Sequence, residues 1–200
     1  MFTRPVCSLP TSLAAGALMA AMALSVPASA SASTSPADTR ATVVTALDYN
    51  STGWRYRQVP PGTDEPFFYE RDFDDSDWTA GQEGFGTTSA RGCSWNNPAT
   101  VKTPWELNTD ILVRHWIHIP RDAQEVRIQG TVDNDAQVYL NGRLVQTAVS
   151  GNCRAGAIDV VVPVRYLDCC NVLAIRGHDR GVASYLNVRV TYVKPTAASA

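Results

Sequence analysis

Residues 125–146 read EVRIQGTVDNDAQVYLNGRLVQ. Apolar and polar residues alternate through Glu125–Val132 and again through Ala136–Leu140, as in strands whose successive side chains point to opposite faces of a sheet. Asn141-Gly142 then separates Ala136–Leu140 from Arg143–Gln146. Asn-Gly favours the type I′ turn, in which both central residues need positive φ. The stretch therefore predicts strands, the last two of them joined as a tight hairpin.

Strand patterns of the same kind continue on both sides of this stretch. We predict further strands at Ile111–Ile119, Ile158–Val164, Val172–Arg176 and Tyr185–Val193. Helical periodicity is missing apart from a single turn around Val164–Leu167. Many short strands spaced by turn signals, without intervening helices, indicate an all-β antiparallel sandwich or barrel. Residues 50–110, which are richer in Gly, Pro and Trp, are expected to form long loops over the sandwich edge.

The composition is that of an ordinary globular protein. The 200 residues are 44% hydrophobic and 18% charged, which suits a single domain. Five Trp, seven Tyr and five Phe exclude disorder for most of the chain. A formal net charge of −2 gives no electrostatic reason to expect nucleic acid or an anionic membrane as a partner.

The N-terminus has the organisation of a secretory signal peptide over residues 1–30. Arg4 supplies the positive start, Leu13–Val26 the apolar stretch, and Ala28-Ser29-Ala30 the small residues of a cleavage site. The apolar stretch is shorter than the roughly 20 residues that a membrane span needs. We therefore expect a secreted, extracellular protein with no membrane span.

The rest of the chain divides by composition. Residues 31–42 are small and polar and predict a disordered leader, and residues 194–200 predict a flexible tail of the same character. Between them, residues 43–193 are expected to form one folded domain.

Four cysteines follow the predicted signal peptide, namely Cys93, Cys153, Cys169 and Cys170. An even number in an oxidising compartment favours two disulfide bonds. Neighbouring cysteines rarely bridge each other, because the ring that results strains the peptide. We therefore expect Cys93 and Cys153 each to pair with one member of Cys169-Cys170. A zinc site is disfavoured, since the chain has no C-x-x-C spacing.

One ordered series of motifs resembles the galactose-binding-domain-like jelly roll, as found in the sugar-binding domains of glycoside hydrolases related to β-galactosidase. The resemblance covers roughly residues 43–193. Its motifs are Trp54-Arg55-Tyr56, Asp72–Trp78, Gly84-Phe85-Gly86, Thr103-Pro104-Trp105, Ile111–Arg114, Val132–Asp135, Val138–Gly142, Asn171–Arg176 and Ser184-Tyr185-Leu186. The resemblance implies a jelly-roll β-sandwich. It does not name a ligand, because one fold hosts many functions.

Members of that family usually carry the jelly roll beside a catalytic barrel, for which this sequence has no room. The chain also has no nucleophile elbow, no H-E-x-x-H and no glycine-rich phosphate loop. We therefore expect a binding module rather than an enzyme, with carbohydrate or a cell-surface glycan as ligand. The alternative is an adaptor or inhibitor module that binds another exported protein.

The predicted ligand site lies in loops. Trp95 stands among amides beside Cys93, and an exposed indole suits stacking on a sugar ring while Asn96 and Asn97 bond its hydroxyl groups. His178 and Asp179, in a loop after a predicted strand, are further candidates for a polar ligand. Trp54 and Trp78 belong to the family-like motifs and are expected in the core.

No cofactor is expected, although a structural calcium ion stays an open alternative. Asp72, Asp74, Ser76 and Glu83 have the spacing of ligands 1, 3, 5 and 12 of a calcium loop. The glycine that such a loop needs at its sixth position is missing, which favours a solvated turn. Asp133-Asn134-Asp135 is another polar loop end, and its simplest interpretation is a turn in which the side chains bond their own backbone.

His115 and His118 have a spacing that suggests metal ligands. On a strand, however, residues three apart point to opposite faces. His115 shares the apolar face of Val113 and Ile117, which favours a core histidine with its hydrogen bonds satisfied.

Overall fold

The structure is a computed structural model that describes residues 41–87, 101–168 and 170–194. These residues form twelve strands and one 3-10 turn. The elements are β1 Thr42–Leu47, β2 Thr52–Val59, β3 Thr79–Gln82, β4 Phe85–Gly86, β5 Thr103–Pro104, β6 Asp110–Ile117, β7 Gln124–Asp133, β8 Asp135–Leu140, β9 Arg143–Val149, β10 Arg154–Val162, η1 Val164–Tyr166, β11 Asn171–His178 and β12 Tyr185–Lys194. The predicted all-β sandwich is confirmed.

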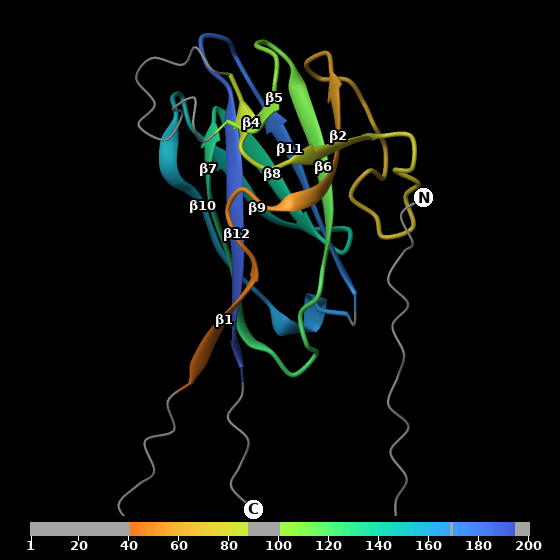
Figure 1. Ribbon diagram of the computed structural model, residues 1–200, viewed down its shortest axis with the longest axis vertical. Coiled ribbons are helices and arrows are strands. Elements are labelled where there is room, and N and C mark those ends of the chain that lie inside the picture. Colours follow the sequence, from red (N-terminus) through yellow and green to blue (C-terminus); the bar gives the residue numbers. More distant parts are fainter. Residues whose placement is uncertain (1–40, 88–100, 169, 195–200) are drawn as a thin grey trace, which may run out of the picture. The chain divides into compact units, whose positions relative to one another are not determined.

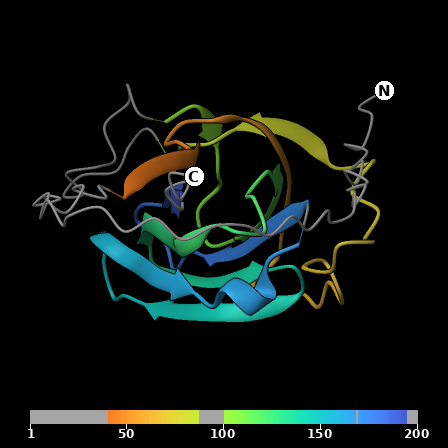
Figure 2. The same ribbon diagram turned by 90° about the horizontal axis from the view of Figure 1, so that it is seen from below.

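Two six-stranded sheets pack face to face (Figures 1 and 2). The first sheet has the order β10-β7-β12-β4-β5, with β1 also paired to β12. The second has the order β3-β2-β6-β11-β8-β9. Among the described residues, all strand pairs are antiparallel except β4–β5, which is parallel. No helix of the described part is long and apolar enough to cross a membrane.

The hairpin predicted from Asn141-Gly142 is confirmed. β8 and β9 pair as antiparallel neighbours on either side of it, with Leu140 opposite Arg143. Asn141 has a φ of 50° and Gly142 a φ of 83°, as a type I′ turn requires. The turn also closes onto β11, because Asn141 Oδ1 accepts the backbone N–H of Val172 at 2.9 Å.

The expectation of long loops for residues 50–110 is partly wrong. β2 and β3 lie there, and β2 is an interior strand of the second sheet, between β3 and β6. Polar and aromatic side chains alternate along β2. Trp54 is buried in the core, and Arg55 and Arg57 lie on either side of Tyr56. The flanking glycine and prolines hide this alternation when the sequence is read without its partner strands.

The main core lies between the sheets, and a smaller apolar cluster lies on the outer face of the second sheet. Strand alternation separates them. Ile111 and Val113 belong to the main core, whereas Leu112 belongs to the smaller cluster. The smaller cluster consists of Val59, Phe68, Trp78, Leu112, Val172 and Ala174. Trp54 and Trp78 are both buried, as expected.

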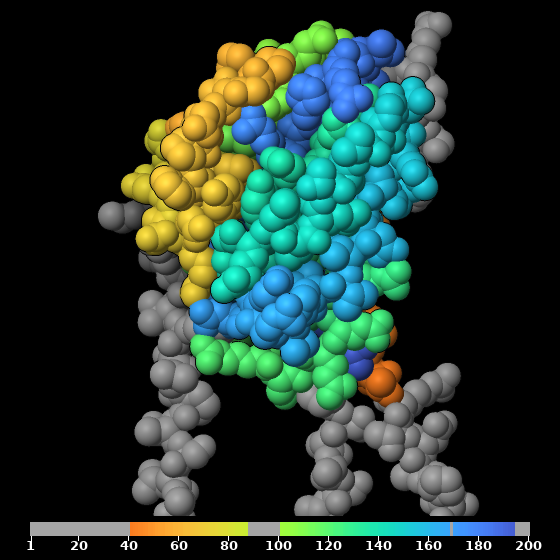
Figure 3. Space-filling model, turned by 180° about the vertical axis from the view of Figure 1, so that it is seen from behind, coloured from red at the N-terminus to blue at the C-terminus, as the bar shows by residue number. Residues whose placement is uncertain are grey.

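Residues Pro60–Trp78 cover this smaller cluster, and we call them the covering segment. In Figure 3 the segment, coloured orange to yellow, lies beside the teal surface of β8 and β9. Arg114 anchors it from the sheet below, and its side chain is only 2% exposed. Its guanidinium donates to Asp75 Oδ2 at 2.7 Å, to the carbonyl oxygen of Glu70 at 2.9 Å and to that of Phe68.

Replacing Arg114 with methionine is expected to destabilise the protein by about 3–5 kcal/mol, because one partner of a buried ion pair is removed and its acceptors stay behind. Urea unfolding followed by Trp fluorescence measures the change. Arg127→Met is the matched control, since Arg127 forms a well-exposed pair with Asp159 and should have little effect. Equal unfolding midpoints for Arg114→Met and the wild type would contradict the anchoring role.

Glu83 is a buried carboxyl group that joins the two sheets. It is 1% exposed, its Oε1 accepts the backbone N–H of Val188 at 2.5 Å, and its Oε2 accepts the hydroxyl of Ser51 at 3.4 Å. Burial raises the pKa of Glu83 well above its usual range, with the two hydrogen bonds opposing the rise. The folded protein therefore favours the protonated form of this group.

Replacing Glu83 with glutamine should flatten part of the pH dependence of stability. A raised pKa in the folded state contributes stability below the unfolded value near 4.5, and this contribution is lost as the pH rises through the folded pKa. We expect Glu83→Gln to match the wild type near pH 4.5 and to be more stable at pH 8. Thermal unfolding across this range tests it, and parallel curves for the two proteins would contradict the assignment.

Candidate functional site

An open pocket of about 570 Å³ lies on the outer face of the second sheet, beside the covering segment. Gly62, Thr63 and Asp64 of that segment form one wall. Side chains of four neighbouring strands form the rest. These strand residues are Asp110 of β6, Arg176 and His178 of β11, Asp135, Ala136 and Gln137 of β8, and Thr147 and Val149 of β9.

The register of the sheet brings these residues together. Asp110 lies opposite His178, His178 opposite Asp135, and Asp135 opposite Val149, so that one row crosses four strands. The next row on the same face contains Arg176, Gln137 and Thr147. Because residues two apart on a strand share a face, both rows face the pocket.

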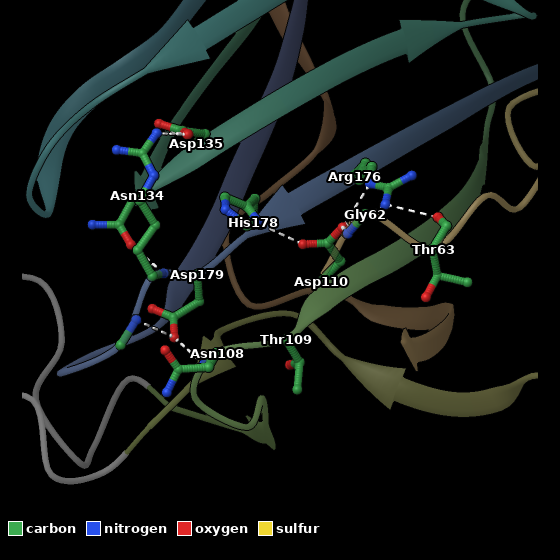
Figure 4. A network of polar contacts seen from close by, with 12 residues as sticks. Gly62, Thr63, Asn108, Thr109, Asp110, Asn134, Asp135, Arg176, His178 and Asp179 are labelled. Carbon is green, nitrogen blue, oxygen red and sulfur yellow. Dashed lines mark hydrogen bonds and ion pairs between the residues drawn. The ribbon is translucent and has the colours of Figure 1, made fainter. Parts of the chain in front are cut away.

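Asp110 organises the floor of the pocket (Figure 4). Its side chain is 2% exposed, and its Oδ2 accepts from Arg176 Nε at 2.9 Å, from Arg176 Nη2 at 2.5 Å and from the backbone N–H of Gly62 at 3.2 Å. Its Oδ1 lies 2.5 Å from Nδ1 of His178. Arg176 Nη2 also donates to the carbonyl oxygen of Thr63 at 2.8 Å. The carboxylate thereby fixes Arg176, His178 and the wall of the pocket.

His178 is held so that its second ring nitrogen is left for a ligand. Nδ1 bonds to Asp110, and no hydrogen bond to Nε2 occurs among the described residues. The side chain is 36% exposed and lines the pocket. A histidine fixed in this way by a carboxylate presents Nε2 in one orientation.

The other polar groups of the floor differ in how far they are engaged. Asp135 accepts the backbone N–H of Ser150 at 3.0 Å and pairs with Arg180. Gln137 Oε1 accepts only a long hydrogen bond, 3.3 Å, from the hydroxyl of Tyr139. The pocket therefore offers both donors and acceptors. Among the described residues, its lining includes no Phe, Tyr or Trp side chain.

The structure separates the two predicted residues His178 and Asp179. Asp179 is 1% exposed and does not line the pocket, and its Oδ2 accepts the backbone N–H groups of Asn108 at 2.6 Å and Gly181 at 2.9 Å. Burial raises the pKa of Asp179, and these two hydrogen bonds oppose the rise. Ligand binding by His178 stays a prediction that its position allows, whereas Asp179 holds the turn after β11.

The loop Asp133-Asn134-Asp135 contributes in three different ways. Asp135 faces the pocket, while Asn134 Oδ1 accepts the backbone N–H of Arg180 at 2.8 Å instead of bonding its own backbone. Asp133 is buried, and burial together with the negative charge of Asp179 raises the pKa of Asp133 to about 6. Asn134 therefore bonds to the turn after β11. The interpretation that this loop is a turn whose side chains bond their own backbone does not hold for Asn134.

The remaining predicted ligand residues, Trp95, Asn96 and Asn97, lie outside the described residues, as do Cys93 and Cys169. Their roles stay predictions. Cys153 and Cys170 are disulfide-bonded. The predicted pairing of the four cysteines stays a prediction.

The calcium loop considered for Asp72–Glu83 does not form. Glu83 is buried against Val188, and Asp75 pairs with Arg114, while Asp74 Oδ1 accepts the backbone N–H of Ser76 at 3.1 Å as in a simple turn. Within the described residues, no group of three or more His, Cys, Asp and Glu side chains has the arrangement of a metal site.

His115 does not take part in a metal pair with His118 either. Its Nε2 lies 2.9 Å from the carbonyl oxygen of Thr52, and its ring packs against Trp54 with 5.0 Å between centroids. Burial lowers the pKa of His115, so the neutral ring is favoured. The expected core histidine is therefore satisfied only in part, because its Nε2 is bonded within the fold while its Nδ1 is buried without a hydrogen-bond partner.

Sequence reasoning missed Asp110, Arg176, Gln137 and Thr147. Each of these residues lies on a strand. The spacing of apolar residues around it predicts the strand but gives no sign of a ligand site. Strand alternation places Arg176 and His178 on one face, since they are two apart, and this was a usable signal. Nothing in the sequence aligns them with Asp110 and Gln137, because pairing register depends on contacts between distant strands.

Comparison with solved structures shows the class of fold. A β-glucuronidase from Bacteroides uniformis superposes with a TM-score of 0.52 at 14% identity, over 76% of this chain and 18% of that chain. Bacteroides uniformis β-glucuronidase 2, covalently bound to cyclophellitol-6-carboxylate aziridine, gives a TM-score of 0.51 at 16% identity with the same coverage. No protein-family model and no curated protein matches the chain.

The fold is a jelly-roll β-sandwich like the matched part of these β-glucuronidases, and it carries a polar pocket on one sheet face. The resemblance stated from the sequence motifs is confirmed at the level of the fold. The chain spans about a fifth of the length of these enzymes. At such low identity the comparison carries the fold alone.

Proposed function

We propose that the protein is a secreted, non-catalytic carbohydrate-binding module whose ligand site is the pocket on the outer face of the second sheet. The observation that carries the proposal is the prearranged floor, in which buried Asp110 holds Arg176 and His178 beside Gln137 and Thr147. A pocket of about 570 Å³ has the size of small-molecule sites. Resemblance to domains of sugar-processing enzymes supports the ligand class by analogy.

The chemistry of the lining suits hydroxyl groups, each of which donates one hydrogen bond and accepts others. The Thr147 hydroxyl both donates and accepts, the Nε2 of neutral His178 accepts because Nδ1 donates to Asp110, and the carboxylate of Asp64 accepts only. Asp64, Asp110 and Asp135 outnumber Arg176 and Arg180, so the balance of charge disfavours an anionic ligand. A neutral saccharide fits this balance.

The engaged carboxylates support binding over catalysis. Hydrolysis of a glycoside needs two carboxyl groups free to act on opposite sides of the bond. Asp110 accepts from Arg176, Gly62 and His178, and Asp135 pairs with Arg180. Asp64 alone of the three is exposed at the rim.

Gln137→Ala combined with Thr147→Ala should weaken glycan binding about tenfold or more, because two hydrogen-bonding groups of the floor are lost. A glycan array first identifies the ligand, and titration with that glycan then compares affinities. The melting temperature should stay unchanged. Gln124→Ala combined with Thr79→Ala is the matched control, since both residues are exposed and outside the pocket.

Two results would contradict this placement. Full binding by the pocket variant together with loss of binding in Trp95→Ala would assign the site to the loop of Trp95, Asn96 and Asn97. A blank array, with an exported protein retained by the purified chain during washing in free sugars, would favour the adaptor or inhibitor alternative.

Secretion has a separate test. If residues 1–30 act as a signal peptide, the protein recovered from the medium should begin at Ser31, as cleavage after Ala30 predicts. Mass spectrometry of the intact protein measures this N-terminus. A secreted chain that still begins at Met1, or a protein found only inside the cells, would contradict the assignment.

A further inference from the structure

Two buried carboxyl groups lie on adjoining segments beside the pocket, and neither lines it. Asp133 ends β7 and is 5% exposed, and Asp179 directly follows β11 and is 1% exposed. Two hydrogen bonds align their segments, from the backbone N–H of Asn134 to the carbonyl oxygen of His178 at 3.0 Å and from the backbone N–H of Arg180 to Asn134 Oδ1 at 2.8 Å. Figure 4 shows Asn134 and Asp179 on these adjoining segments.

One oxygen of each carboxyl group has no partner. Asp133 Oδ1 and Asp179 Oδ1 are both buried and accept no hydrogen bond. Buried polar atoms are otherwise almost always satisfied, and buried charges are paired or coordinate a metal. Two such oxygens on neighbouring residues are therefore a feature that the protein's own hydrogen bonds leave unexplained.

The basic side chains nearby are engaged elsewhere. Arg180 pairs with Asp135, while Arg176 and His178 bond to Asp110. Burial raises the pKa of Asp179, and the two backbone N–H groups that its other oxygen accepts oppose the rise. Since the negative charge of Asp179 also acts on Asp133, the two carboxyl groups lie within electrostatic reach.

We infer that Asp133 and Asp179 bind one hard divalent cation of the Ca²⁺ type through their unpartnered Oδ1 atoms. The donor set consists of oxygen alone, which Ca²⁺ prefers and Zn²⁺ does not. Ca²⁺ takes 6–8 oxygen ligands in flexible geometry, so backbone carbonyl groups and water would complete the shell. With only two carboxylates, the affinity belongs to the weak range of extracellular modules, Kd about 10⁻⁴ M.

The ion would tie the end of β7 to the turn after β11. Asp135 and His178 stand within two residues of the two ligands and line the pocket. The cation therefore steadies one side of the pocket without contacting the sugar. This inference goes beyond the proposed function and does not depend on it, because the ion needs no glycan in order to bind.

Thermal unfolding of protein stripped with EDTA and then titrated with CaCl₂ tests the site. At a hundredfold excess over Kd the melting temperature should rise by about 5–10 °C. Asp133→Asn and Asp179→Asn should each abolish the rise, whereas Asp122→Asn, at an exposed position, should keep it. NaCl at equal ionic strength controls for screening, and isothermal titration with CaCl₂ gives the stoichiometry, expected to be one.

No rise in the wild type, or an equal rise in Asp133→Asn, would overturn the site. Asp179 also holds two backbone N–H groups, so Asp133→Asn carries the test if Asp179→Asn does not fold. The glycan array run with EDTA keeps the two proposals apart. Sugar binding without any calcium response overturns only the cation site, and a calcium response with a blank array overturns only the sugar proposal.

Discussion

The buried guanidinium of Arg114 is the interaction on which the arrangement of the second sheet depends. It lies on the outer face of a sheet whose other face forms the core, and it holds the covering segment by donating to Asp75 and to two backbone carbonyl oxygens. A buried cation is tolerated only where such acceptors surround it. The anchor therefore decides which half of the sheet face is covered and which half is open.

The uncovered half of the sheet face forms the pocket, and a second buried charged residue, Asp110, organises its polar side chains. Asp110 lies four residues before Arg114 on β6, so both point to the same face. Arg114 holds the covering segment. Asp110 accepts a hydrogen bond from Gly62 near the start of that segment and orients Arg176 and His178. A ligand site with fixed polar groups loses little conformational entropy on binding.

The similarity to β-glucuronidases concerns the fold and not the function. In those enzymes the matched part is 18% of the chain, and a jelly roll is a scaffold on which different sites are built. This chain carries the row Asp110, His178, Asp135 and Val149 across four strands, with two buried carboxyl groups on the adjoining segments. Any function argued for it rests on these residues rather than on the fold.

The sequence by itself determined the strands from Ile111 onward, the hairpin at Asn141-Gly142 and the burial of Trp54 and Trp78, because alternation and turn chemistry are local properties. It also indicated His178. Only the tertiary structure decided that Asp110 meets His178 and that Glu83, placed in a calcium loop by spacing alone, is buried against Val188. Register and burial arise from contacts between strands far apart in the chain, and no local pattern encodes them.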